Sequence, residues 1–243
     1  MALINFKSSG DTRSLQMPGD FSITSTGAIH TTGLIKMNVF PSSFRIESKG
    51  RVIYLDPYVI ENAKPADYIF ITHPHMDHMS MPNIKKIAKK ETLIVCPKTA
   101  VKRLSRYNVK EVKPGETFEM GDMKCETVAS YNTRPGLLWM PLHPKSAKYT
   151  GYILTLGGAR VYHAGDSDYI PEMKEIKNIT VAMIPIGMGT TAMNPEQAAA
   201  MINEMKPDVA IPMHYALGKN VARNFRDMVD KGVRVEILQE GEQ

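Results

Sequence analysis

Three of the chain's seven histidines lie within six residues, in a segment that reads Thr-His-Pro-His-Met-Asp-His over residues 72–78. Imidazole nitrogens and a carboxylate at this spacing, directly after the apolar run 68–71, are typical ligands of divalent transition metals. The plain alternative is three exposed loop histidines, which leaves their spacing unexplained. We therefore expect this segment to hold one or two metal ions.

The order of these residues predicts how they divide between two ions. A chain that is still extended where it leaves a strand places residues i and i+2 on the same side, so His73 and His75 can converge on one ion. Asp77 and His78 are adjacent and diverge in an extended chain. If a turn or helix begins there, both can point into the same pocket and bind a second ion.

Other polar residues follow apolar strands in the same way. Asp166 comes shortly after the predicted strand Arg160–His163, and His214 comes shortly after the predicted strand Val209–Ile211. Sites in layered α/β proteins gather on loops at one sheet edge, so we expect both residues to be metal ligands. Asp56 ends a further strand and is either a hydrogen-bond partner of a ligand histidine or a plain turn residue.

The chain has the size and composition of one ordinary globular domain. It has 243 residues, of which 43% are hydrophobic and 23% charged, and we expect a single domain over residues 1–243. No apolar run approaches the ~18 residues of a membrane span. Met1–Asp20 lacks an apolar signal core, so we expect a cytoplasmic protein that is not inserted in a membrane. Cys96 and Cys125 predict buried free thiols.

The net charge is +5, and part of it lies in one basic segment. The lysines of residues 85–90 fall outside the apolar stripe of Ile84, Ile87 and Ala88, which predicts a solvated helix face. The alternative is a patch that attracts an anionic substrate or nucleic acid. Because aromatic residues do not interleave with most of these charges, we do not expect nucleic acid to be the partner.

Short apolar runs alternate with helical patterns, which predicts a layered α/β protein with antiparallel strands first and strand–helix–strand units later. The best-marked helix begins after Asn194, because Asn is a good N-cap and Pro195 suits the first turn. The predicted helices are Met81–Lys90, Lys98–Tyr107, Ile170–Lys174, Pro195–Met205 and Asn220–Lys231. The predicted strands are Ile35–Phe40, Phe44–Ser48, Arg51–Leu55, Tyr68–Thr72, Thr92–Val95, Phe118–Met120, Met123–Ser130, Tyr149–Leu156, Arg160–His163, Val181–Ile184, Val209–Ile211 and Arg234–Ile237.

Residues 72–78, Gly165-Asp166 and Met213-His214, in this order, resemble the metallo-β-lactamase fold superfamily of metal-dependent hydrolases. The resemblance extends from about Ile35 to the C-terminus. It implies an α/β fold, a four-layer αββα sandwich of two mixed β-sheets with outer helices, with the metals at one edge. On this basis His73 and His75 hold the first ion, Asp77, His78 and His214 hold the second, and Asp166 bridges the two.

A finer resemblance concerns residues 55–58, 162–166 and 212–215, which are most similar to the branch that includes ascorbate-6-phosphate lactonase. One position departs from the family pattern, which usually supplies a third histidine to the first ion, because Asn132 stands in the corresponding stretch. Asn132 could ligate through its amide oxygen, His143 could fold back from eleven residues later, or the first site could be impaired. We expect His143 or Asn132 to line the site, without choosing between them.

The loop Thr133–Lys148 carries the chain's one tryptophan, Trp139. Its apolar tip could form a substrate wall or lid or an oligomer contact, or it could pack in the core. Arg134, Lys145 and Lys148 could bind an anionic group, although solvation is the ordinary state of such residues. A homo-oligomer is therefore left open.

The motif and the resemblance together predict a metal-dependent hydrolase that uses a metal-bound hydroxide on a small ester, lactone or phosphorylated metabolite. Zinc is the expected ion, with manganese, iron and nickel as alternatives. Asp77 would orient the hydroxide, and His163 or Tyr215 would protonate the leaving group. The alternatives are a phosphodiesterase or nuclease, a non-catalytic metal-binding protein and a di-iron redox enzyme. The predicted metal ligands are His73, His75, Asp77, His78, Asn132, His143, Asp166 and His214, and the predicted catalytic residues are Asp77 and His163.

Overall fold

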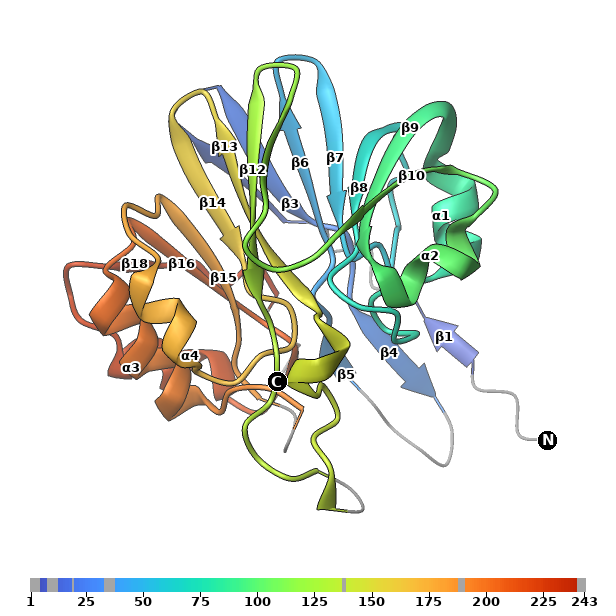
Figure 1. Ribbon diagram of the computed structural model, residues 1–243. Helices are drawn as coiled ribbons and strands as arrows, with labels where there is room; N and C mark the ends of the chain where they lie inside the picture. Colours follow the sequence, from blue (N-terminus) through green and yellow to red (C-terminus); the bar gives the residue numbers. More distant parts are fainter. Residues whose placement is uncertain are drawn as a thin grey trace.

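The computed structural model of the chain describes residues 5–7, 13–18, 20–32, 38–136, 139–187 and 191–239. Two seven-stranded sheets face each other, and a pair of helices lies on the outer side of each (Figure 1). This arrangement confirms the predicted four-layer αββα sandwich. A small third sheet, which was not predicted, contains β1 (Asn5–Lys7), β4 (Ile29–Thr32), β5 (Asn38–Phe40) and β17 (Tyr215–Ala216).

The first large sheet contains, in spatial order, β10 (Asn108–Val112), β9 (Ala88–Pro97), β8 (Ala66–Phe70), β7 (Arg51–Leu55), β6 (Phe44–Ser48), β3 (Phe21–Ser25) and β2 (Ser14–Met17). The strands from β2 to β7 pair antiparallel, whereas those from β7 to β10 pair parallel. The parallel strands are joined by α1 (Met81–Ile87) and α2 (Lys98–Leu104), which cover the outer face of this half.

The second large sheet contains, in spatial order, β11 (Thr117–Met120), β12 (Met123–Ala129), β13 (Thr150–Leu156), β14 (Ala159–His163), β15 (Val181–Pro185), β16 (Val209–Met213) and β18 (Arg234–Val235). Pairing is antiparallel from β11 to β14 and parallel from β14 to β18. Its outer face is covered by α3 (Pro195–Met205) and α4 (Val221–Met228), and short 3-10 turns occupy Lys145–Ala147 and Pro171–Glu175.

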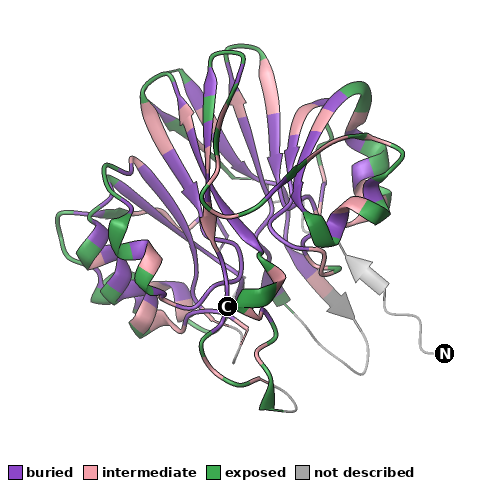
Figure 2. Cartoon of the chain, viewed as in Figure 1, coloured by how far each residue is buried: buried purple, intermediate pink, exposed green. Residues whose placement is uncertain are grey.

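Two apolar clusters hold the layers together. The larger cluster lies between the two sheets and extends to α3 and α4, and in it the rings of Phe70 and Tyr152 meet edge to face at 5.0 Å. The smaller cluster lies between the first sheet and its two helices. Figure 2 shows this division, with buried strands in the middle and exposed outer helix surfaces. Cys96 and Cys125 are buried free thiols, as predicted.

Local signals explain the best-predicted helix, α3. The Asn194 side chain accepts a hydrogen bond from Gln197 N at 2.8 Å, and the Gln197 side chain accepts one from Asn194 N at 3.2 Å. This reciprocal capping satisfies two amides that a helix start otherwise leaves without partners. Lys206 ends the helix in a left-handed conformation with φ of 51°. The predicted range Pro195–Met205 is confirmed.

Strand pairing overrides the helical pattern after residue 87. The helix predicted over Met81–Lys90 ends at Ile87, because Ala88 pairs with Ala66 and the Thr92 hydroxyl accepts a hydrogen bond from Lys89 N at 2.7 Å. The pattern also missed β10, an edge strand with mixed polar and apolar residues. Of the predicted strand Ile35–Phe40, the part before Asn38 lies outside the described residues.

Four N-terminal strands, β1, β2, β3 and β4, were not predicted either. Residues 14–17 and 21–24 do alternate between polar and apolar, but each of these strands is only three to five residues long. The strands find their place by pairing, β2 with β3, β3 with β6, and β4 with β1 and β5. None of the helices formed by the described residues has the length and apolarity needed to cross a membrane.

Candidate metal centre

The candidate site forms at one edge of the sandwich, where strands of both sheets end. The loop after β8 carries residues 72–78, Asp166 follows β14, and His214 follows β16. Strands β14, β15 and β16 are parallel neighbours, so their carboxyl ends share this edge. Gly165 has a φ of 62°, and a Cβ there would lie 3.0 Å from Cβ of Thr72. Glycine therefore lets the two sheets' loops approach each other.

Three histidines form the first group of donor atoms, here called the three-histidine group: His73, His75 and His143. His143 Nε2 lies 3.2 Å from His73 Nε2 and 3.1 Å from His75 Nδ1. The loop 133–148 thus folds back across eleven residues, as one of the three alternatives required. The structure brings His143, and not Asn132, against the two histidines of the motif.

Two carboxylates and two imidazoles form the second group, here called the mixed group: Asp77, His78, Asp166 and His214. Asp166 Oδ2 lies 3.2 Å from His78 Nε2 and 3.1 Å from His214 Nε2. Asp77 Oδ2 lies 3.5 Å from His214 Nε2, and its side chain is 44% exposed while the others are buried. A turn after His75, whose carbonyl accepts from His78 N at 3.1 Å, lets Asp77 and His78 face the same group.

Asp56 orients a ring in each group. Its carboxylate accepts hydrogen bonds from Thr72 N at 2.8 Å, from Thr72 Oγ1 at 2.6 Å and from His78 Nδ1 at 2.7 Å. Because the Thr72 hydroxyl donates to Asp56, it accepts from His73 Nδ1 at 2.9 Å. The Nδ1 protons of His73 and His78 therefore point away from the donor groups, and their Nε2 atoms point inward.

Asn132 gives the third ring of the three-histidine group its orientation. Asn132 Oδ1 accepts from His143 N at 3.2 Å and from His143 Nδ1 at 2.7 Å, and Asn132 Nδ2 donates to Thr191 O at 3.0 Å. The backbone amide identifies Oδ1 as the acceptor, so His143 Nδ1 carries the proton and His143 Nε2 carries a lone pair. Asn132 thus contacts the ring of His143 and positions it.

Both donor sets fit a divalent transition metal. In the three-histidine group the Nε2 lone pairs of His73 and His143 face each other at 3.2 Å, which is repulsive unless a cation lies among them. In the mixed group His78 Nε2 and Asp166 Oδ1 are buried without a hydrogen-bond partner among the described residues. Imidazole with carboxylate is a donor set that zinc, iron and manganese accept.

The pKa values of the histidines shift downward in the three-histidine group and upward in the mixed group. Burial lowers the pKa of His73 well below its ordinary value and that of His143 to about 4, so both rings are neutral at pH 7. Burial also disfavours a charged His78, but Asp166 and Asp56 outweigh it and raise the pKa of His78 well above its ordinary value. Burial raises the pKa of Asp166, yet the charges of His214 and His78 lower it further, so this carboxyl is ionised.

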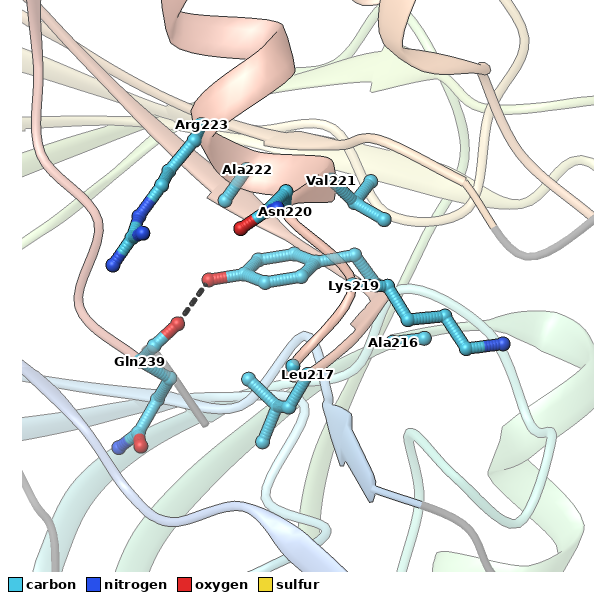
Figure 3. Close-up of a pocket in the computed structure, with 10 residues that line it drawn as sticks. Ala216, Leu217, Lys219, Asn220, Val221, Ala222, Arg223 and Gln239 are labelled. Atoms are coloured by element: carbon cyan, nitrogen blue, oxygen red, sulfur yellow. Dashed lines mark hydrogen bonds between the residues drawn. The ribbon is translucent and has the colours of Figure 1, made fainter. Parts of the chain in front are cut away.

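The predicted proton donors are held elsewhere. The side chain of His163 is buried, its Nε2 donates to Ser42 O at 2.9 Å and its Nδ1 accepts from Gly165 N at 3.2 Å. Both ring nitrogens thus bind backbone, and His163 belongs to neither donor group, so its catalytic role stays a prediction that these contacts do not support. The Tyr215 hydroxyl donates to Gln239 O in a small cavity of about 30 Å³ at the start of α4 (Figure 3).

Exposed apolar side chains lie on two of the loops that carry histidines of the site. Met76, between His75 and Asp77, is 75% exposed, and Trp139 and Met140 on the loop 133–148 are 90% and 67% exposed. This exposure rules out core packing for Trp139. The loop residues Leu137 and Leu138 lie outside the described part of the chain.

The cations expected to bind an anion are mostly paired. Arg134 Nη2 lies 2.8 Å from Asp168 Oδ1, and Lys145 Nζ lies 2.8 Å from Glu172 Oε1. Lys148 forms no ion pair with any residue that the structure describes. Of these three cations, Lys148 is the one whose charge no described carboxylate neutralises, so it can bind an anion.

Sequence reasoning missed two contributors to the site. Thr72 links His73 to Asp56, because its hydroxyl accepts from His73 Nδ1 and donates to the Asp56 carboxylate. Its hydroxyl directly before a ligand histidine is the sequence signal that could have identified Thr72. Tyr149 packs its ring 5.3 Å from the ring of His73 and 5.9 Å from that of His143. No local pattern marks Tyr149, because it stands at the start of an ordinary apolar strand.

Known proteins are similar to this chain in sequence. Residues 40–214 match the model of the "Beta-lactamase superfamily domain". A UPF0173 metal-dependent hydrolase of Archaeoglobus fulgidus is 32% identical over 215 residues, which cover 81% of this chain and 91% of the relative. A UPF0173 protein of Pyrococcus abyssi is 33% identical over 192 residues, which cover 75% of this chain and 84% of the relative.

A solved structure agrees over almost the whole chain. The crystal structure of a Parabacteroides distasonis protein, named among the metal-dependent hydrolases, matches with a TM-score of 0.76 and 28% identity, over 98% of this chain and all of the other. The predicted superfamily is thereby confirmed, while the finer resemblance to the ascorbate-6-phosphate lactonase branch stays a prediction. The chain therefore belongs to the beta-lactamase superfamily and is one of its metal-dependent hydrolases.

Proposed function

We propose that this hydrolase works with two divalent ions, one held by the three-histidine group and one by the mixed group, and that Asp166 lies between them. The observation that carries the proposal is the inward orientation of His73, His78 and His143, each set by a hydrogen bond from its other ring nitrogen. Such outer hydrogen bonds are characteristic of metal-binding histidines. They argue against the reading of a first site impaired by the missing histidine.

When bound, divalent ions supply Lewis acidity and make hydroxide available at neutral pH. The chain itself contributes the position and charge of Asp77, the only half-exposed member of the mixed group. Burial raises the pKa of Asp77, but the hydrogen bond from His214 and the charge of His78 lower it well below its usual range. Asp77 is therefore an ionised acceptor at the entrance, suited to orient a water or a substrate hydroxyl.

The proposed substrates are small esters, lactones or phosphorylated metabolites. Zinc is the proposed ion, because three imidazoles with an open position are a set that zinc uses in hydrolytic sites, and manganese, iron or nickel are the alternatives. The exposed apolar side chains of Met76 and Trp139 support a substrate that carries an apolar part beside the reacting bond.

The test begins with metal content per chain, measured by elemental analysis of protein prepared without chelator. A panel of esters, lactones and phosphomonoesters is then assayed with the metal-loaded protein and with Asp77→Asn. The expected result is metal-dependent turnover of one class, lost in Asp77→Asn while metal is retained. Metal binding without turnover on the whole panel would instead support a non-catalytic metal-binding protein.

A further inference from the structure

We propose that the chain has a second ligand site, separate from the metal centre, for a small organic anion with an apolar body. The site is a cavity of about 610 Å³ beside the end of β12. This volume lies within the range of about 300–1,000 Å³ that is typical of small-molecule sites. The proposal goes beyond the proposed function, because binding at this cavity requires no metal ion.

The cavity has a wall that is fixed by backbone hydrogen bonds. The connection from β10 to β11 crosses β12, as Figure 1 shows, and residues 113–116 of it bind Thr127. Thr127 Oγ1 donates to Lys113 O at 2.7 Å, Gly115 N donates to Thr127 O at 2.8 Å, and Thr127 N donates to Glu116 O at 2.9 Å. The cavity is therefore preformed, as ligand sites usually are.

The charges around the cavity favour an anion. Three lysines and one glutamate line it, and Lys145 is already bound to Glu172 at 2.8 Å and to the Tyr131 hydroxyl at 3.2 Å. Lys113 and Lys148 form no ion pair with any residue that the structure describes. Two uncompensated positive charges at one cavity attract a carboxylate, sulfonate or phosphate group.

The rest of the lining favours an apolar body on that anion. Pro114, Val128 and Ala129 contribute aliphatic surface, and Tyr131 and Tyr149 contribute aromatic rings. Aromatic and aliphatic walls with a few placed charges are the usual composition of a site for an amphipathic small molecule. A bare inorganic ion would leave most of this surface in contact with water.

Tyr149 separates the cavity from the metal centre. Its side chain lines the cavity, and its ring lies 5.3 Å from the ring of His73. None of the donor residues of the three-histidine and mixed groups lines the cavity. An occupant would thus lie next to the metal centre without contacting its ligand atoms.

The experiment is a fluorescence titration with 8-anilinonaphthalene-1-sulfonate, and its uncharged counterpart N-phenyl-1-naphthylamine is the matched probe. The variants are the double change Lys113→Gln with Lys148→Gln, and Ala129→Trp, which fills the cavity. Lys90→Gln is the control, because Lys90 is an exposed lysine far from the cavity lining. Each protein is titrated with and without chelator, and thermal unfolding verifies the fold.

We expect saturable binding of the sulfonate probe to the unchanged protein. Its affinity should fall by about tenfold or more in the double lysine variant, since each charge-assisted contact contributes substantially. It should also fall in Ala129→Trp, and remain unchanged in Lys90→Gln and in the presence of chelator. The uncharged probe should bind more weakly, and its affinity should be the same in the double lysine variant as in the unchanged protein.

Three results would overturn the proposal. They are absence of saturable binding, equal affinity of the double lysine variant and the unchanged protein, and loss of binding on chelation. If the double lysine variant bound the probe fully, a further variant, Trp139→Ser, would be titrated, and loss of binding there would place the probe at the exposed loop tip instead. None of these results bears on whether the metal centre hydrolyses a substrate.

Discussion

The three-histidine group and the mixed group share one sheet edge, but the fold builds them differently. The mixed group takes its residues from loops that directly follow β8, β14 and β16, so neighbouring parallel strands position Asp166 and His214. The three-histidine group takes His143 from the long connection between β12 and β13. Its position depends on Asn132, which contacts both the backbone and the ring of His143.

The two groups also differ in charge. At pH 7 the rings of His73 and His143 are neutral and offer lone pairs only, because burial lowers the pKa of each. The mixed group contains two ionised carboxylates, whose negative charges attract a cation. The comparison teaches that backbone geometry positions Asp166 and His214, whereas side-chain hydrogen bonds position the rings of His73 and His143. The variants below test this difference.

The broadest effect is expected from Asp56→Asn, because Asp56 serves both groups. Asparagine tolerates the left-handed φ of 44° at this position, so the fold should persist. With the new amide NH₂ in the place of Oδ2, neither the Thr72 hydroxyl nor His78 Nδ1 finds an acceptor there, and one ring in each group loses its orientation. Metal affinity at both groups should fall by about 10–100-fold, measured by competition with a chelating dye.

The exposed Asp230 supplies the control for this change, because Asp230→Asn removes the same charge away from the site. It should leave metal binding unchanged. If Asp56→Asn weakened only one of two bound ions, the idea that Asp56 links the groups would fail.

His143→Ala and His78→Ala should each remove one ion and thereby separate the groups. His143→Ala takes one of three donors from the three-histidine group, and His78→Ala takes a buried donor from the mixed group. Elemental analysis should show about two ions per chain falling to about one in each variant. Hydrolysis should fall by about 100-fold or more in both, because the ions act together. Two ions retained in His143→Ala would contradict its role as the replacement for the third family histidine.

Asn132→Ala should weaken the three-histidine group alone. The His143 ring would lose the acceptor of its Nδ1 proton, and metal affinity there should fall by about 10–100-fold while the mixed group keeps its ion. Asn132→Asp is the matched control, because a carboxylate still accepts from His143 N and Nδ1. Equal loss at both groups in Asn132→Ala would indicate general damage, and a thermal unfolding curve would reveal it.

Much of this site follows from one repeated sequence pattern. An apolar strand followed within three residues by a histidine or aspartate occurs at His73, Asp166 and His214, and a sheet edge brings such strand ends together whatever the details of packing. The layered α/β organisation follows from the alternation of short apolar runs and helices. These predictions needed only local sequence and the shared direction of parallel strands, whereas the four-layer sandwich was predicted from the family resemblance.

The remainder depends on contacts between distant residues. The pattern could not choose between Asn132 and His143, because the path of a long loop is set by tertiary hydrogen bonds such as Asn132 N to His143 O at 2.8 Å. The same pattern also selected His163, which ends a strand and whose ring nitrogens bind the backbone of Ser42 and Gly165. Edge strand β10 was missed because solvent contact on one side blurs its apolar pattern.

The smallest effect on stability is expected at the tip of the loop that carries His143. Trp139→Ser removes a side chain that is 90% exposed, so the free energy of unfolding should change by less than about 0.5 kcal/mol and metal content should stay the same. Denaturant unfolding and elemental analysis measure these quantities. If the tip contacts an apolar part of the substrate, KM should rise while kcat holds, because the contact would be the same in ground and transition states. Loss of metal in this variant would mean that the tip, and not only Asn132, holds His143 in place.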